Sequence, residues 1–150
     1  MTRVFSYLTV LVLSLPAMGQ SQEEAVKQTI NQLFTGMHQG NGNLVREAFA
    51  DGAILQTIMR TKDGNVVVRS EEVDSFAAMV ARPHTEVYDE RIEFETLRID
   101  GDLAIAWTPY RFYVGEKFSH CGVNSFQLVK LKGVWKIQYL IDTRRKENCD

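Results

Sequence analysis

The chain has 150 residues, a length typical of a single domain, and a formal net charge of −2 at pH 7. Acidic and basic residues are mixed along it, and the basic run Arg144-Arg145-Lys146 is short. Nucleic-acid binding needs a broader positive surface, so we expect no nucleic-acid partner.

Residues 1–19 have the three parts of a secretory signal. Arg3 gives a positive start, residues 4–15 are apolar, and Ala17-Met18-Gly19 supplies small residues for a signal peptidase. We expect cleavage after this triplet, which would leave residues 20–150 as one domain in the periplasm or the medium. The apolar run is short for a membrane span, and an uncleaved N-terminal anchor is the alternative.

The first elements along the chain are helices. Ser21-Gln22-Glu23-Glu24 is a capping box, and apolar residues at helical spacing follow it, which predicts a helix over residues 22–38. A second, short helix is expected over residues 43–49. Ser70 is expected to cap a third helix, which stops before Pro83.

Strands account for the rest of the chain. Residues 53–60 and 66–68 predict a hairpin around an Asp-Gly turn. From Tyr88 onward the hydrophobic period changes to two. Turns near residues 100–101, 115–117 and 132–133 then divide the segment into four antiparallel strands. Helices grouped apart from an antiparallel sheet predict an α+β fold.

Two-residue turns fix the strand register, and the register decides which side chains share a face. On this basis one end of the inner face is expected to be polar, with Glu90 opposite Arg111. Its members are Tyr88, Glu90, Arg111, Tyr113, His120 and Asn124. The other end is expected to be mainly apolar and to include Trp107, with Tyr139 opposite Phe126. Asp142 is expected on the outer face. Helices over such a sheet predict a cone with a pocket at its open end.

This order of elements resembles the nuclear-transport-factor-2-like, or SnoaL-like, superfamily over about residues 22–145. The resemblance rests on the opening helix, the second helix leading to Asp51, and the ending at residues 126–137. The stretches at residues 106–113 and 119–123 are similar to the bacterial group named putative lumazine-binding. The resemblance implies a cone-shaped, cystatin-like roll with strong sheet curvature. It does not imply one ligand, because this fold hosts unrelated functions.

The polar cluster suggests both chemistry and binding. His120 could carry protons, Tyr113 and Tyr88 could stabilise an oxyanion, and Arg111 could hold a carboxylate or phosphate. Asn124 could orient a polar ring. The candidate catalytic residues are therefore His120, Tyr113 and Arg111, and the candidate ligand-binding residues are Tyr88, Glu90, Trp107, Arg111, Tyr113, His120, Asn124 and Tyr139. In the structural alternative, Glu90 and Arg111 form a buried ion pair and His120 is a core histidine.

Three functions remain open on the sequence alone. The leading hypothesis is an exported domain that binds a small organic molecule. The others are an acid–base enzyme (hydrolase, dehydratase or isomerase) using His120, and a non-catalytic dimeric interaction or stress-related protein. The three histidines are scattered and no CxxC spacing is present, so we expect no metal and no cofactor.

The expected outer sheet face is too apolar to be fully solvated. Its expected apolar members are Ala104, Ala106, Thr108, Tyr110, Phe112, Val123, Val129 and Leu140. Superfamily members often dimerise through this face, so we expect a homodimer. Cys121 lies on the same side. In an oxidising compartment it could form a disulfide with Cys149, and the alternative is two free thiols.

Overall fold

The computed structural model describes residues 21–149, so the predicted signal peptide lies outside the described residues. The helices are α1 (Gln22–Gln39), α2 (Gly42–Ala48) and α3 (Val73–Val80). The strands are β1 (Phe49–Arg60), β2 (Val66–Glu71), β3 (Tyr88–Ile92), β4 (Thr96–Asp100), β5 (Leu103–Val114), β6 (Lys117–Leu131) and β7 (Val134–Thr143). Within this part of the chain, no helix is both long and apolar enough to cross a bilayer.

The helix ends follow local capping rules at two of three starts. The Ser21 hydroxyl accepts the N–H of Glu24 at 3.2 Å, as the capping box predicts. Asn41 caps α2 by accepting the N–H groups of Asn43 and Leu44. The prediction that Ser70 caps α3 is wrong. Ser70 pairs with β1 as part of β2, so α3 begins two residues later, after Glu72.

The sheet has seven strands, six of them in the order β2-β1-β7-β6-β5-β3. β3 pairs with residues 110–114 of β5, and β4 pairs with residues 103–107 of the same strand. The antiparallel succession β5-β6-β7 agrees with the predicted meander. Two features differ from it. β1 runs parallel to β7, which makes the sheet mixed, and the predicted strand over residues 88–100 is interrupted at residues 93–95.

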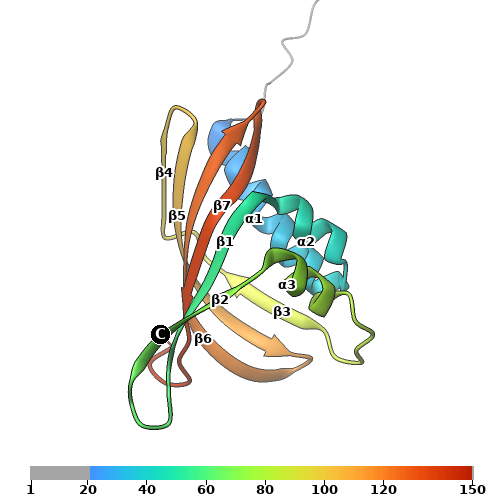
Figure 1. The fold of residues 1–150 in the computed structure, drawn as a ribbon, viewed down its shortest axis with the longest axis vertical. Helices are drawn as coiled ribbons and strands as arrows, with labels where there is room; N and C mark the ends of the chain where they lie inside the picture. Colours follow the sequence, from blue (N-terminus) through green and yellow to red (C-terminus); the bar gives the residue numbers. More distant parts are fainter. Residues whose placement is uncertain (1–20, 150) are drawn as a thin grey trace, which may run out of the picture.

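All three helices lie on one side of the sheet, which curls beneath them (Figure 1). Phe126 and Leu128 of β6 meet Ile30 and Leu33 of α1 in a shared core. The ring of Phe34 packs edge-on against Phe126 with the centroids 6.2 Å apart. Each such fully buried side chain stabilises the fold by about 1.5–3 kcal/mol. The predicted α+β class, with N-terminal helices on a curved sheet, is confirmed.

Two β-bulges set the faces of the central strands. Phe112 pairs with His120 and Tyr113 pairs with Phe118, so Ser119 is an extra residue on β6. In the same way, Gln138 is an extra residue on β7. One extra residue reverses the alternation of side chains relative to the neighbouring strand. The faces expected for parts of β4, β5 and β7 are therefore wrong.

Candidate functional site

A cavity of about 290 Å³ lies between the inner face of the sheet and helices α1 and α3. Apolar side chains from both layers form much of its wall, and the polar groups come from β1, β2, β3, β5, β6 and the end of β7. The lining residues include Leu33, Phe34, Met37, Leu55, Thr57, Glu71, Phe76, Met79, Val80, Tyr88, Glu90, Tyr110, Phe112, His120, Asn124, Leu140, Asp142 and Arg144.

Asp142 is the best-satisfied charge in this cavity. Its carboxylate accepts hydrogen bonds from Thr57 Oγ1 at 2.6 Å, Tyr110 Oη at 3.0 Å and Arg144 Nε at 3.1 Å. Arg144 also donates through Nη2 to Thr57 Oγ1, at 3.2 Å. Burial and the neighbouring Asp142 both raise the pKa of the Tyr110 hydroxyl, so Tyr110 stays a neutral donor.

Glu90 is the second carboxyl in the cavity, and its surroundings differ. Asn124 donates to it, Nδ2 to Oε1 at 2.8 Å. Burial raises the pKa of Glu90 to about 7, against the opposing effect of the Asn124 hydrogen bond. The charge of Asp142 adds to the rise and that of Arg144 reduces it. Near neutral pH, Glu90 therefore exists in both protonation states.

His120 lies on the inner face of β6, where the sequence analysis placed it, with Ser119 Oγ 3.0 Å from its Nδ1. Burial lowers the pKa of His120. The positive charges of Arg144 and Lys146 lower it further and outweigh Asp142. The imidazole is therefore neutral at pH 7 and can both donate and accept a hydrogen bond.

Four rings form a continuous aromatic wall, which comprises Tyr88, Phe112, His120 and Tyr110. Successive ring centroids lie 6.1 Å, 5.0 Å and 5.7 Å apart, on the adjacent strands β3, β5 and β6. All four side chains line the cavity. The rings are tilted or edge-on to one another, and together they provide an aromatic surface beside the Glu90–Asn124 hydrogen bond. Such an arrangement is typical of small-molecule sites.

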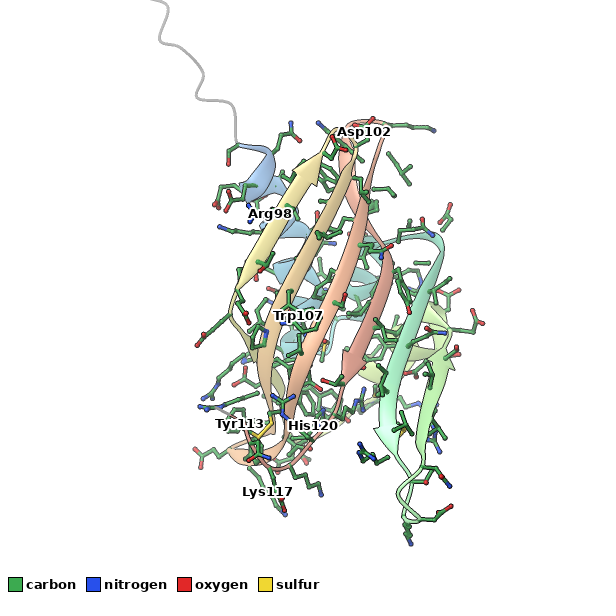
Figure 2. The ribbon with its side chains drawn as sticks, turned by 90° about the vertical axis from the view of Figure 1, so that its left-hand side faces the viewer. Arg98, Asp102, Trp107, Tyr113, Lys117 and His120 are labelled. Atoms are coloured by element: carbon green, nitrogen blue, oxygen red, sulfur yellow. A yellow bond between two sulfur atoms is a disulfide. The ribbon has the colours of Figure 1, made fainter. Side chains whose placement is uncertain are left out.

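Arg111, Tyr113 and Trp107 do not reach the cavity. They project from the outer face of β5, which Figure 2 shows with Trp107 at the middle of the strand and Tyr113 near its end. The bulge at Ser119 is the reason for the difference. Of the three predicted catalytic residues, only His120 faces the cavity, so the predicted catalytic set is not assembled.

The predicted Glu90–Arg111 ion pair is also wrong. Arg111 donates to the backbone carbonyl of Cys149 through Nη2 at 2.8 Å and Nε at 3.2 Å. Cys149 is held there by a disulfide to Cys121, visible in Figure 2 as the yellow bond near Tyr113. The C-terminal segment thus folds back along the outer face. Glu90 has Asn124 as its partner instead.

The bulge at Gln138 exchanges the places of two further residues. Tyr139, predicted to contact the ligand, pairs with Ile54 and donates its hydroxyl to Gln56 Oε1 at 2.8 Å, outside the cavity. Asp142, predicted to face outward, lines the cavity. Tyr88, Glu90 and Asn124 line it as the sequence analysis expected, and their role in ligand binding stays a prediction.

Sequence reasoning missed five polar lining residues: Thr57, Glu71, Tyr110, Asp142 and Arg144. Tyr110 and Asp142 were assigned to the wrong face because a one-residue bulge has no distinct signature in an alternating pattern. Thr57 joins them through the parallel β1–β7 pairing, which links distant parts of the chain. Within residues 21–149, no group of three or more His, Cys, Asp or Glu side chains could hold a metal ion.

Comparison with known proteins identifies the family. The model of the family described as "Putative lumazine-binding" matches residues 21–139. The chain belongs to this family. No curated protein matches it.

Solved structures show the same fold at low identity. A nuclear-transport-factor-2-like protein of unknown function from Shewanella baltica is 13% identical, with a TM-score of 0.63 over 84% of this chain and 95% of that one. A protein with a cystatin-like fold from Novosphingobium aromaticivorans is 9% identical, with a TM-score of 0.66 over 84% and 83%. A protein from Xanthomonas campestris named as a calcium/calmodulin-dependent protein kinase II association domain is 22% identical, with a TM-score of 0.62 over 96% and 99%.

Proposed function

We propose that this protein binds a small organic molecule in the inner cavity. The observation that carries the proposal is the combination of an aromatic wall with a partly desolvated hydrogen-bonding pair, Glu90 and Asn124, in one cavity. Such a combination provides apolar contact for the body of a ligand and a fixed direction for one polar group. The family description, which names a lumazine, supports the same class of function.

The cavity volume limits the size of the ligand. At about 290 Å³ it lies at the lower end of the range of roughly 300–1,000 Å³ found for ligand pockets. A molecule of one or two fused rings is therefore the expected occupant. Lumazine, a planar two-ring heterocycle, is a suitable first probe because its ring can stack on the aromatic wall while its polar edge meets Asn124.

A fluorescence titration with lumazine tests the proposal, in parallel with native mass spectrometry of the freshly purified protein for a copurified molecule. Replacing Met79 with Trp on α3 fills the cavity from the helix side and is expected to weaken binding at least tenfold. Tyr139→Phe, on the outer face, is the matched control and is expected to leave binding unchanged. The proposal fails if neither lumazine nor a copurified molecule binds the wild type, or if Met79→Trp leaves such binding unchanged.

We also propose that the outer sheet face is the interface of a homodimer. The bulge at Ser119 changes the residues that form the proposed interface. The alanines of β5 that were expected on the outer face are buried in the core. Ile105, Gln127, Tyr139 and Ile54 instead form one row across β5, β6, β7 and β1. Trp107, 45% exposed, begins the next row. A broad face that carries exposed Ile and Trp side chains suits a second copy, because a two-fold axis pairs the same patch with itself.

Analytical ultracentrifugation at micromolar concentration tests the homodimer. Trp107→Glu and Ile105→Glu are expected to produce monomers. Val66→Glu introduces the same charge at an exposed position of the β2 hairpin and is expected to preserve the dimer. A wild-type protein that sediments as a monomer would contradict this proposal.

Export of the mature domain remains our proposal as well. The Cys121–Cys149 disulfide supports it, because such bonds persist in oxidising compartments. Expression with the native leader and mass analysis of the periplasmic and culture fractions tests it. The expected mass begins at Gln20 and is lower by two hydrogen atoms than that of the reduced chain. A full-length product confined to the cells would contradict it.

A further inference from the structure

The cavity carries an excess of negative charge. Three carboxyl groups line it, from Glu71, Glu90 and Asp142, against a single guanidinium, that of Arg144. Arg144 is already bonded to Asp142 at 3.1 Å, so these two charges largely cancel. Among residues 21–149, no lysine or arginine side chain forms an ion pair with Glu90. An ionised Glu90 therefore lacks a countercharge of its own.

Aromatic side chains line the cavity that holds this unmatched carboxyl. Glu90 pairs with Phe112 across β3 and β5, and the Phe112 ring lies between those of Tyr88 and His120. Phe34 of α1 and Phe76 of α3 close the cavity from the helix side. Aromatic faces attract cations through their electron-rich centres, by roughly 2 kcal/mol or more where water is excluded.

We infer that the cavity selects organic cations, with a charged nitrogen of the ligand beside the Glu90 carboxylate and its apolar body on the aromatic wall. The inference rests on the proposed small-molecule binding and names the chemical class of the ligand. An anion would add a further negative charge beside Glu90 and Asp142. A neutral ligand would leave an ionised Glu90 without a countercharge. An ammonium or protonated ring nitrogen supplies the missing charge directly.

The titratable and charged groups that line the cavity with Glu90 are Tyr88, Tyr110, His120, Asp142, Arg144 and the exposed Glu71. On the α1 side, His38 and Glu90 border a second, shallower hollow. Helix α3 contributes only apolar side chains to the cavity. Arg144 is thus the one fixed cation in the described lining, and it serves Asp142.

Cationic and neutral ligands are expected to change the number of bound protons in opposite directions. A ligand cation and a proton compete for the same Glu90 carboxylate, whose pKa is about 7 in the free protein. Cation binding therefore lowers this pKa and releases protons near pH 7, and affinity rises with pH. A neutral ligand that accepts a hydrogen bond from protonated Glu90 would take up protons instead, and its affinity would fall as pH rises.

Isothermal titration calorimetry with three matched indoles tests the inference: tryptamine, tryptophol and indole-3-acetate share one ring system and differ in charge. Tryptamine is expected to bind at least tenfold more tightly than tryptophol at pH 7.5, and indole-3-acetate is expected to bind most weakly. Titrations in two buffers of different ionisation enthalpy report the protons exchanged. Proton release with tryptamine, and tighter binding at pH 8 than at pH 6, are the expected results.

Two variants with the same change of net charge locate the effect. Glu90→Gln is expected to remove the preference for tryptamine over tryptophol and the proton release that accompanies tryptamine binding. Asp89 lies next to Glu90 on β3, and its carboxylate is bonded to Arg91. Asp89→Asn is therefore expected to behave as the wild type. A preference that survives Glu90→Gln would overturn the assignment.

The failures of the two proposals can be told apart. If tryptophol binds as tightly as tryptamine, or binds with proton uptake, the cation inference is wrong and cavity binding stands. If no indole binds, the one-ring set of benzylamine, benzyl alcohol and benzoate replaces them, and absence of benzylamine binding overturns the inference. The lumazine titration with Met79→Trp decides separately whether the cavity binds any small molecule.

Discussion

Asn124 on β6 donates a 2.8 Å hydrogen bond to Glu90 on β3, across the intervening strand β5. The curl of the sheet brings these two side chains together over 34 positions of sequence. The bond holds the Glu90 carboxyl inside the cavity, yet it does not outweigh burial, since the pKa of Glu90 is still raised to about 7. The balance between burial and the Asn124 hydrogen bond therefore sets the charge of Glu90 near neutral pH.

Replacing Glu90 with Gln is expected to change how stability depends on pH. The folded-state pKa of about 7 lies above the ordinary value of 4.5, so the wild type loses stability as pH rises through this interval. The gap corresponds to up to about 3 kcal/mol. The difference in unfolding free energy, Glu90→Gln minus wild type, should therefore increase by that order between pH 4.5 and pH 8. Urea unfolding at several pH values measures it, and a constant difference would contradict the raised pKa.

His120 is expected to titrate below its ordinary value of 6.5, because burial and the nearby Arg144 both oppose its protonation. Its contribution to stability is present above pH 6.5 and is lost as pH falls through the folded-state pKa, the opposite sign to Glu90. NMR titration of the His120 ring, assigned with a His120→Gln variant, measures the pKa. The same protein unfolded in urea is the reference. A folded value at or above the unfolded one would refute the expectation.

Tyr110→Phe is expected to destabilise the fold by about 1–3 kcal/mol. The hydroxyl lies 3.0 Å from Asp142 Oδ2 and 2.9 Å from the carbonyl of Thr143, and its loss removes a donor from a buried carboxylate. The phenyl ring keeps the packing. Tyr139→Phe removes an equivalent hydroxyl from the more exposed outer face and should cost less than 1 kcal/mol. Equal losses in denaturant unfolding would show that Asp142 does not depend on Tyr110.

Removing the disulfide should lower stability through the unfolded chain. The bond closes a segment with a sequence separation of 28 residues. Loops of this size correspond to roughly 3.5 kcal/mol. The double variant Cys121→Ser, Cys149→Ser is expected to unfold at lower denaturant. Lumazine affinity should stay within twofold, because the bond lies outside the cavity. If the double variant is fully folded but binds lumazine much more weakly, the C-terminal segment contributes to the site.

Local patterns in the sequence determined the helices and the class of fold. Ser21 and the apolar stripe of α1 act within a few residues, so the capping box and the helical period predict the helix directly. The alternation of β6 predicted its inner side chains, including His120 and Asn124, because a strand's own pleat has a fixed period of two. The family resemblance was visible at this level as well.

The pairing of strands was decided by the tertiary structure. Ser119 and Gln138 are bulges, and nothing in an alternating sequence marks which residue is left unpaired. The bulge at Ser119 places Arg111 and Tyr113 on the outer face and Tyr110 on the inner face. The bulge at Gln138 places Tyr139 on the outer face and Asp142 on the inner face.

Glu90 shows how closely the outcome depends on such details. The bulge at Ser119 reverses the faces of β5 and β4 relative to β6, and the interruption at residues 93–95 reverses the face of β3 again. Two reversals cancel, so Glu90 and Tyr88 face the cavity as the regular register had predicted. The sequence by itself determined which side chains alternate along each strand. The curvature, the bulges and the packed helices decided which of them share one cavity, because those depend on contacts between distant parts of the chain.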